Sequence, residues 1–84
     1  MTPAFADTYY YLALGNRRDA GHARAAAHAR SRRRFVTTAW VITELADALC
    51  RAATRPAFRR LHGLILTDPH TTVVPADQSL LDRG

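Results

Sequence analysis

Residues 35–45, FVTTAWVITEL, join a short β-forming run directly to a helical pattern, and this joint indicates the fold class. Phe35–Thr38 carries the branched and aromatic side chains that favour a strand. Thr38 is a good N-cap, and the apolar residues after it recur at helical spacing. The stretch therefore predicts a strand that passes without a loop into a helix over residues 39 to about 53.

Strand and helix signals alternate on both sides of this joint. Asp19 is placed to cap a helix, and Pro56 suits the first turn of another. The predicted order is strand 3–7, helix 8–14, helix 20–32, strand 35–38, helix 39–53, helix 56–66, strand 71–76 and a helix that opens at Asp77. Such alternation predicts an α/β fold, with a short parallel sheet flanked by helices.

Length and composition indicate one small globular domain. The chain has 84 residues, of which 48% are hydrophobic. No apolar run approaches the roughly 20 residues that a membrane helix needs, and the first residues lack the pattern of a signal peptide. Cys50 is the only cysteine, which excludes an internal disulfide and a CxxC motif. We therefore expect a cytoplasmic protein without a membrane partner.

Arginine dominates the charge of the chain. All twelve basic residues are arginines, against seven acids, which gives a net charge of +5. Guanidinium groups bind phosphate oxygens in pairs, so the arginine-rich segment 17–34 is a candidate nucleic-acid surface. Its candidate residues are Arg17, Arg18, Arg24, Arg32, Arg33 and Arg34. The same segment could instead bind an acidic protein or form a solvated helix face.

Two acidic residues are candidates for a metal site. Asp7 ends the first predicted strand, and Glu44, the only glutamate, lies early in the helix after the second. Ligands of open α/β sheets bind at the carboxyl ends of the strands, where carboxylates can hold Mg²⁺. The alternatives are that Asp7 caps the helix at Thr8 and that Glu44 is a solvated side chain. We expect the tyrosines at 9–11 to anchor the first helix in the core rather than to stack on bases, although Tyr9 could face the mouth of such a site.

Four stretches carry a resemblance to a known family. They are Phe5-Ala-Asp7-Thr8, residues 19–25 (DAGHARA), residues 35–45 and residues 73–84 (VVPADQSLLDRG). In this order and spacing the chain resembles PIN-domain proteins, and among them the VapC-type toxin ribonucleases of VapBC toxin–antitoxin pairs. The resemblance implies the N-terminal part of a PIN-like (Rossmann-like) three-layer domain, with a short parallel sheet flanked by helices.

The same resemblance implies an activity. It predicts an endoribonuclease that depends on Mg²⁺ or Mn²⁺, cleaves RNA, forms a homodimer and is silenced by a cognate antitoxin. Asp7 and Glu44 match the family's metal ligands, and Thr8 matches a hydroxyl that orients the metal or its water. Asp77 and Asp82 match positions of the fold but not ligands.

The chain departs from the family pattern in one respect. The third and fourth acids of the family lie beyond the helix that starts at Asp77, so residues 1–84 are expected to form a single incomplete PIN-like domain that is inactive or impaired. Two other hypotheses stay open. One is a non-catalytic basic α/β module that binds RNA or an acidic antitoxin-type partner. The other is a small α/β unit that is stable only as a dimer.

Overall fold

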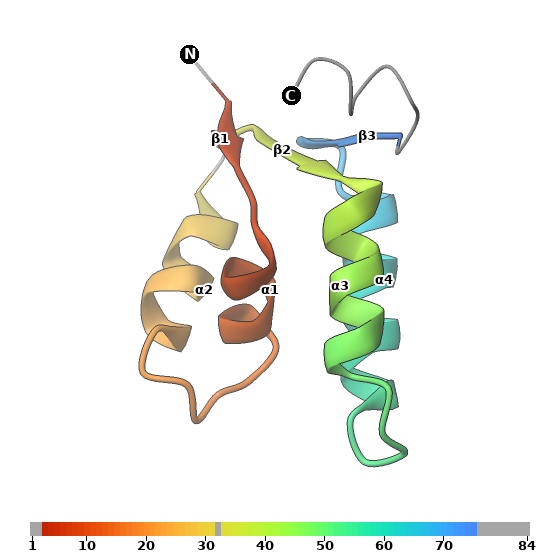
Figure 1. The fold of residues 1–84 in the computed structure, drawn as a ribbon. Helices are drawn as coiled ribbons and strands as arrows, with labels where there is room; N and C mark the ends of the chain where they lie inside the picture. The colour runs from red at the N-terminus through yellow and green to blue at the C-terminus, as the bar shows by residue number, and fades with distance from the viewer. Residues whose placement is uncertain (1–2, 32, 76–84) are drawn as a thin grey trace.

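The computed structural model describes residues 3–31 and 33–75 of the chain (Figure 1). Its elements alternate as the sequence predicts. They are β1 (Ala4–Phe5), α1 (Thr8–Leu14), α2 (His22–Arg30), β2 (Phe35–Thr38), α3 (Ala39–Ala48), α4 (Arg55–Thr67) and β3 (Thr71–Val74). The predicted helix at Asp77 lies outside the described residues, together with Asp82 and Arg32.

The three strands form one parallel sheet in the order β1-β2-β3. Ala4 pairs with Phe35 in the first ladder, and Thr38 pairs with Val74 in the second. Parallel strands need long crossover connections, and these are α1 with α2 and then α3 with α4. The predicted α/β fold with a short parallel sheet is therefore confirmed.

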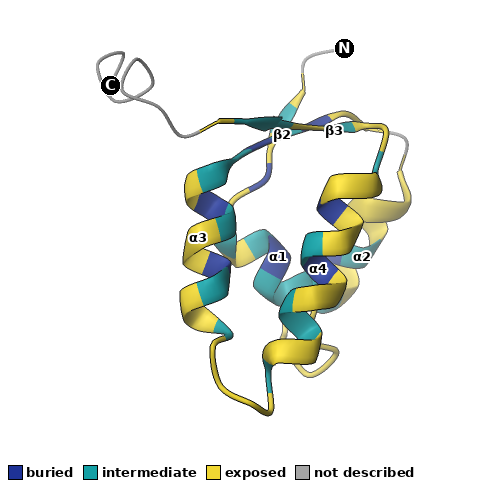
Figure 2. Ribbon diagram, turned by 90° about the vertical axis from the view of Figure 1, so that its right-hand side faces the viewer, coloured by how far each residue is buried: buried dark blue, intermediate teal, exposed yellow. Residues whose placement is uncertain are grey.

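The helices all lie on one side of the sheet (Figures 1 and 2). Tyr11 of α1, Leu45 of α3 and Ile65 of α4 are each at most 3% exposed, and they form one core with Phe35 of β2. The described residues thus supply the sheet and one helical layer. No helix in this part of the chain is long and apolar enough to cross a membrane.

Two helix starts follow directly from capping residues. The Asp7 side chain accepts a hydrogen bond from the Tyr10 N–H at 2.8 Å, and α1 begins at the next residue. The Thr38 hydroxyl accepts one from the Val41 N–H at 3.2 Å at the start of α3. These bonds satisfy N–H groups that a helix terminus leaves without partners. The Thr38 cap confirms the sequence prediction, and the Asp7 cap is one of the two interpretations that the sequence left open for that residue.

Two predicted helix boundaries were wrong. Asp19 does not cap α2, because its carboxylate accepts the Gly21 N–H at 2.7 Å and forms a turn before the helix. The helix begins at His22, after Gly21 and without a side-chain cap. The helix α3 ends at Ala48 instead of about residue 53, because the chain turns back there so that α4 packs along α3.

A carboxylate also fixes the turn from α4 to β3. Asp68 follows the last residue of α4, and its oxygens accept hydrogen bonds from the Thr71 hydroxyl at 2.7 Å and the His70 N–H at 2.9 Å. Because these bonds favour the charged form, they lower the pKa of Asp68. The turn brings β3 alongside β2, which completes the described sheet.

Candidate active site

A buried hydroxyl fixes the backbone just before the first candidate acid. Thr37 of β2 is fully buried, and its hydroxyl donates to the Ala6 carbonyl at 2.9 Å. Ala6 itself is 1% exposed and immediately precedes Asp7. Since a buried backbone group with a side-chain partner is costly to displace, this bond fixes the end of β1 against β2.

Tyr11 belongs to the same buried core as Ala6. It is 3% exposed and packs edge-on against Tyr10, which stacks on Phe35. Burial raises the pKa of Tyr11 to about 12, against the opposing effect of the neighbouring Thr37 hydroxyl. Burial also raises the pKa of Tyr10. These two tyrosines therefore anchor α1 in the core, as the sequence predicts, whereas Tyr9 is 81% exposed and the same expectation was wrong for it.

The two candidate acids meet in one open hollow at the carboxyl ends of β1 and β2. Asp7, Thr8 and Glu44 line it together. The Thr8 hydroxyl donates to Glu44 Oε2 at 3.2 Å, across 36 positions of sequence. The structure thus brings together the three residues that the sequence selected for this site.

Asp7 serves the helix and faces the hollow at the same time. Its Oδ1 accepts the Tyr10 N–H, whereas its Oδ2 accepts no hydrogen bond from residues 3–31 and 33–75. The cap fixes the carboxylate and leaves one oxygen for a ligand. The two interpretations of Asp7 that the sequence left open are therefore compatible.

The donor set suits a hard cation. Two carboxylates and a hydroxyl are oxygen ligands of the kind that Mg²⁺ prefers, and Mg²⁺ commonly uses one or two carboxylates together with water and substrate phosphate. No group of three or more His, Cys, Asp or Glu side chains that could hold a metal occurs within the described ranges. The residues present therefore fit a cation held by few protein ligands and open to substrate.

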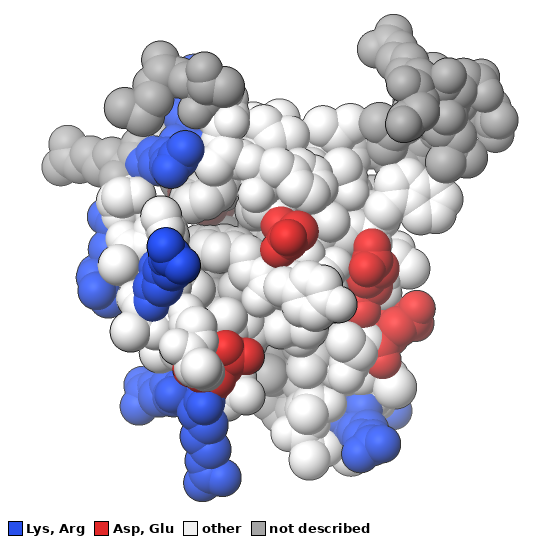
Figure 3. All heavy atoms as spheres, turned by 60° about the vertical axis from the view of Figure 1, so that its left-hand side comes forward, with Lys and Arg blue, Asp and Glu red and all other residues white. Residues whose placement is uncertain are grey.

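A second hollow adjoins the first, between α1 and α2. It is lined by Asp7, Tyr9, Arg24 and His28, among others, so that Asp7 and Tyr9 belong to both hollows. On the face in Figure 3, acidic side chains lie at the centre and toward the right, with one at the lower left beside basic side chains, and most basic side chains lie along the left margin. Arg24, one of the arginines selected from the sequence, thus shares a hollow with Asp7.

The other selected arginines lie elsewhere. Arg17 lines a hollow that Arg60 also lines, and Arg18 is an exposed residue of the α1–α2 loop. Arg33 and Arg34 are exposed in the link between α2 and β2. The described arginines therefore form no single row beside the acid pair.

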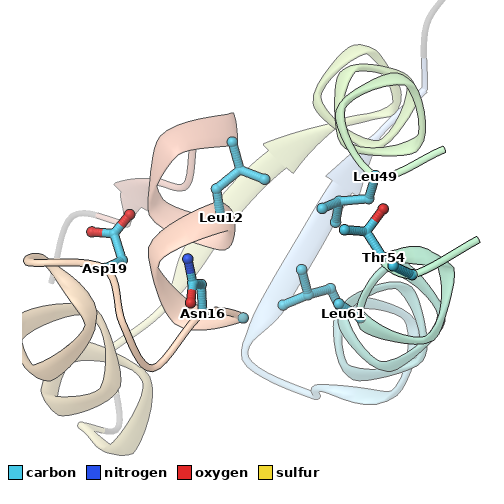
Figure 4. A pocket seen from close by; sticks show the side chains of 9 residues that line it. Leu12, Asn16, Asp19, Leu49, Thr54 and Leu61 are labelled. Atoms are coloured by element: carbon cyan, nitrogen blue, oxygen red, sulfur yellow. The ribbon is translucent and has the colours of Figure 1, made fainter. Parts of the chain in front are cut away.

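Another cavity is remote from these acids. It has a volume of about 490 Å³ and lies between the end of α1 and the turn that joins α3 to α4 (Figure 4). Its lining is apolar at Leu12, Leu49 and Leu61 and polar at Asn16 and Thr54. Asp7 lies at the opposite end of α1, so this cavity is not part of the candidate site.

Sequence reasoning missed two features of the site. Thr37 gave no signal beyond its place in a strand, although strand alternation puts it on the same face as the buried Phe35. The aromatic residues Phe5 and Trp40 also line the acidic hollow. An exposed aromatic residue cannot be distinguished from a core residue until the packing is known.

No protein-family model and no curated protein matches the chain. Among solved structures it is similar to VapC20 of Mycobacterium tuberculosis, described as a Sarcin-Ricin loop cleaving toxin, with a TM-score of 0.76 and 23% sequence identity. The similarity covers 95% of this chain and 62% of VapC20. The chain therefore has the fold of a VapC toxin over about three fifths of that protein's length, and the predicted resemblance is confirmed at the level of the fold.

Proposed function

We propose that this chain is the nuclease unit of a VapC-like toxin, an endoribonuclease that hydrolyses RNA phosphodiesters with the help of Mg²⁺ or Mn²⁺. The observation that supports this function is the meeting of Asp7 and Glu44 in one hollow at the carboxyl ends of β1 and β2. The fold shared with VapC20, a loop-cleaving toxin, is consistent with it. A homodimer and a cognate antitoxin belong to the same proposal, as does a cytoplasmic location.

The chemistry requires a cation because a phosphodiester is anionic and repels a hydroxide nucleophile. When bound, a divalent ion neutralises the phosphate, lowers the pKa of a water and stabilises the leaving oxygen. Asp7 contributes Oδ2, while the Tyr10 N–H fixes its other oxygen. Glu44 contributes its carboxylate, oriented by the Thr8 hydroxyl. In the adjoining hollow, Arg24 binds a neighbouring phosphate of the RNA.

The expected activity of these residues by themselves is low. Two carboxylates hold Mg²⁺ weakly, and within the described segments no third side chain completes a cluster. Cleavage should therefore need about millimolar rather than micromolar concentrations of the metal ion, because few protein ligands hold it. We propose that residues 1–84 form one PIN-like domain.

Matched carboxylate variants test the function. Asp7→Asn and Glu44→Gln remove one candidate ligand each, whereas Asp47→Asn removes an exposed carboxylate from the same helix as Glu44 that does not line the hollow. We expect Mg²⁺-dependent cleavage of single-stranded RNA by the unmodified chain and by Asp47→Asn. The first two variants should be inactive. If all four chains cleave equally, the assigned chemistry is wrong.

A non-catalytic basic module is the second candidate function. It is favoured by the exposed Arg33 and Arg34, which lie outside the acidic hollow, and by the net charge of +5. Binding of RNA or of an acidic protein through these residues should weaken steeply with salt and should be insensitive to Glu44→Gln. Charge reversal of both arginines that leaves binding unchanged would exclude this function.

A further inference from the structure

Three large aromatic side chains stand exposed around the acid pair. Tyr9 is 81% exposed, Phe5 is 62% exposed and Trp40 is 44% exposed. All three line the hollow that contains Asp7 and Glu44. We call Phe5, Tyr9 and Trp40 the aromatic rim.

The rim contributes no residue to the buried core or to the side chains packed against that core. Its residues come from β1, α1 and α3, three separate elements that meet at this point. The neighbouring Tyr10 and Tyr11 are packed into the core or against it, so α1 has its hydrophobic anchors without Tyr9. Exposed apolar side chains that gather in one place commonly mark a binding site.

The surroundings of the rim favour nucleic acid as the ligand. Tyr9 also lines the adjoining hollow with Arg24 and His28, so aromatic, acidic and basic side chains follow one another across the two hollows. A nucleotide presents the matching series: a base with a flat face, a phosphate that a cation can bridge to the acids, and a neighbouring phosphate for the arginine. An apolar peptide offers no partner for Arg24 or for a bridged cation.

We propose that the aromatic rim stacks on an unpaired base of RNA and so holds the strand across the acid pair. Every base has a π face, so stacking on tyrosine or tryptophan tolerates many sequences. Bases inside a duplex are already stacked and paired, and side chains reach them poorly. The inference rests on the proposed nuclease function, because it names the residues that bind a base of the RNA in that same hollow.

Trp40 supplies the test, because it is the only tryptophan of the chain. Its fluorescence is recorded at low salt with EDTA during titration with a single-stranded oligoribonucleotide, an abasic strand of the same length, and a duplex. We expect saturable quenching by the single strand and little change with the other two. Equal changes with the abasic strand, or no change with any of the three, would overturn the proposal.

Variants of Tyr9 give a second readout. Tyr9→Ala should weaken single-strand binding about tenfold, and Tyr9→Phe should retain it, since one base stacked on an aromatic ring contributes roughly that much affinity. Leu66→Ala is the matched control, because Leu66 is 63% exposed on α4 and does not line either hollow. If Tyr9→Ala and Leu66→Ala bind alike, the stacking role is wrong.

Different results of the binding and cleavage experiments would contradict the stacking role of the aromatic rim and the proposed nuclease function. Binding is measured without metal, so it does not depend on a cation at the acid pair. Stacking with no loss of cleavage in Asp7→Asn would contradict the nuclease chemistry and not the rim. Loss of cleavage in Asp7→Asn, together with equal binding of abasic and ordinary strands, would contradict the rim and not the chemistry. An acidic peptide that quenches Trp40 where the single strand does not would identify a protein surface instead.

Discussion

The hydroxyl of Thr8 is the most informative single group to remove. It donates to Glu44 Oε2 at 3.2 Å, and this contact links Glu44 to the residue that follows Asp7. Thr8→Val keeps the shape of the side chain and deletes the donor. Removing a group that orients a metal ligand typically lowers metal affinity by about 10- to 100-fold, which corresponds to about 1.4–2.7 kcal/mol.

The same change should hardly affect folding. The hydrogen bond lies at an exposed site, so its loss should change the free energy of unfolding by less than about 1 kcal/mol. Mn²⁺ affinity is measured by isothermal titration calorimetry on the unmodified chain, Thr8→Val and Thr8→Ser, and urea unfolding is measured in parallel. Thr8→Ser retains the donor and should bind Mn²⁺ like the unmodified chain. Unchanged Mn²⁺ affinity in Thr8→Val, or an equal loss of affinity in both variants, would contradict the role of the Thr8 hydroxyl in orienting Glu44.

Three further predictions concern the framework of the site. Leu45→Ala, at a core position that is 1% exposed, should lower the free energy of unfolding by about 2–5 kcal/mol in urea titrations; a smaller change than in the exposed Leu66→Ala would contradict the assigned core. Thr37→Val should lower it by about 0.5–1.5 kcal/mol through loss of the bond to Ala6, and Thr37→Ser should do so less if that bond is what matters. The pKa of Tyr11 is about 12 in the fold and 10.0 ordinarily, so its neutral form stabilises the fold below pH 10; this stabilisation, up to about 2.7 kcal/mol, should disappear as pH rises from 10 to 12, and unfolding of Tyr11→Phe should depend less on pH there.

The β2–α3 joint could be predicted because its signals are local. A strand-forming run, a threonine cap and a helical apolar stripe are all contained in residues 35–45. The cap at Asp7, one of two interpretations of that residue, also depends on a local signal, because a carboxylate one residue before a helix accepts the free N–H groups of the helix. The convergence of Asp7 and Glu44 then followed from topology alone, because parallel strands bring their carboxyl ends to one edge.

The remaining boundaries depend on information that the local sequence does not contain. Asp19 uses the same chemistry in a turn that it would use in a helix cap, since in both cases the carboxylate accepts an N–H a few residues later. The end of α3 depends on where α4 must begin to pack against it. A local helical pattern through residue 53 does not contain that constraint.

The candidate site shows the same division. Its ligand-type residues were predicted because carboxylates near strand ends are visible in the sequence. The contact of Thr37 with Ala6 and the exposure of the aromatic rim were not, because both depend on which surfaces the other elements cover. The sequence likewise did not distinguish Arg24, which lies beside Asp7, from Arg17, which lies in a different hollow.

The proposed nuclease function requires that Asp7 and Glu44 bind one cation together. Mn²⁺ shortens the relaxation of nearby nuclei, so substoichiometric Mn²⁺ added to isotope-labelled protein reports the position of the ion by NMR. We predict that the amide signals of Asp7, Thr8 and Glu44 broaden first, and that either Asp7→Asn or Glu44→Gln abolishes the effect at all three. Broadening centred on other carboxylates, such as Asp47 or Asp68, or broadening at Glu44 that persists in Asp7→Asn, would contradict the shared site.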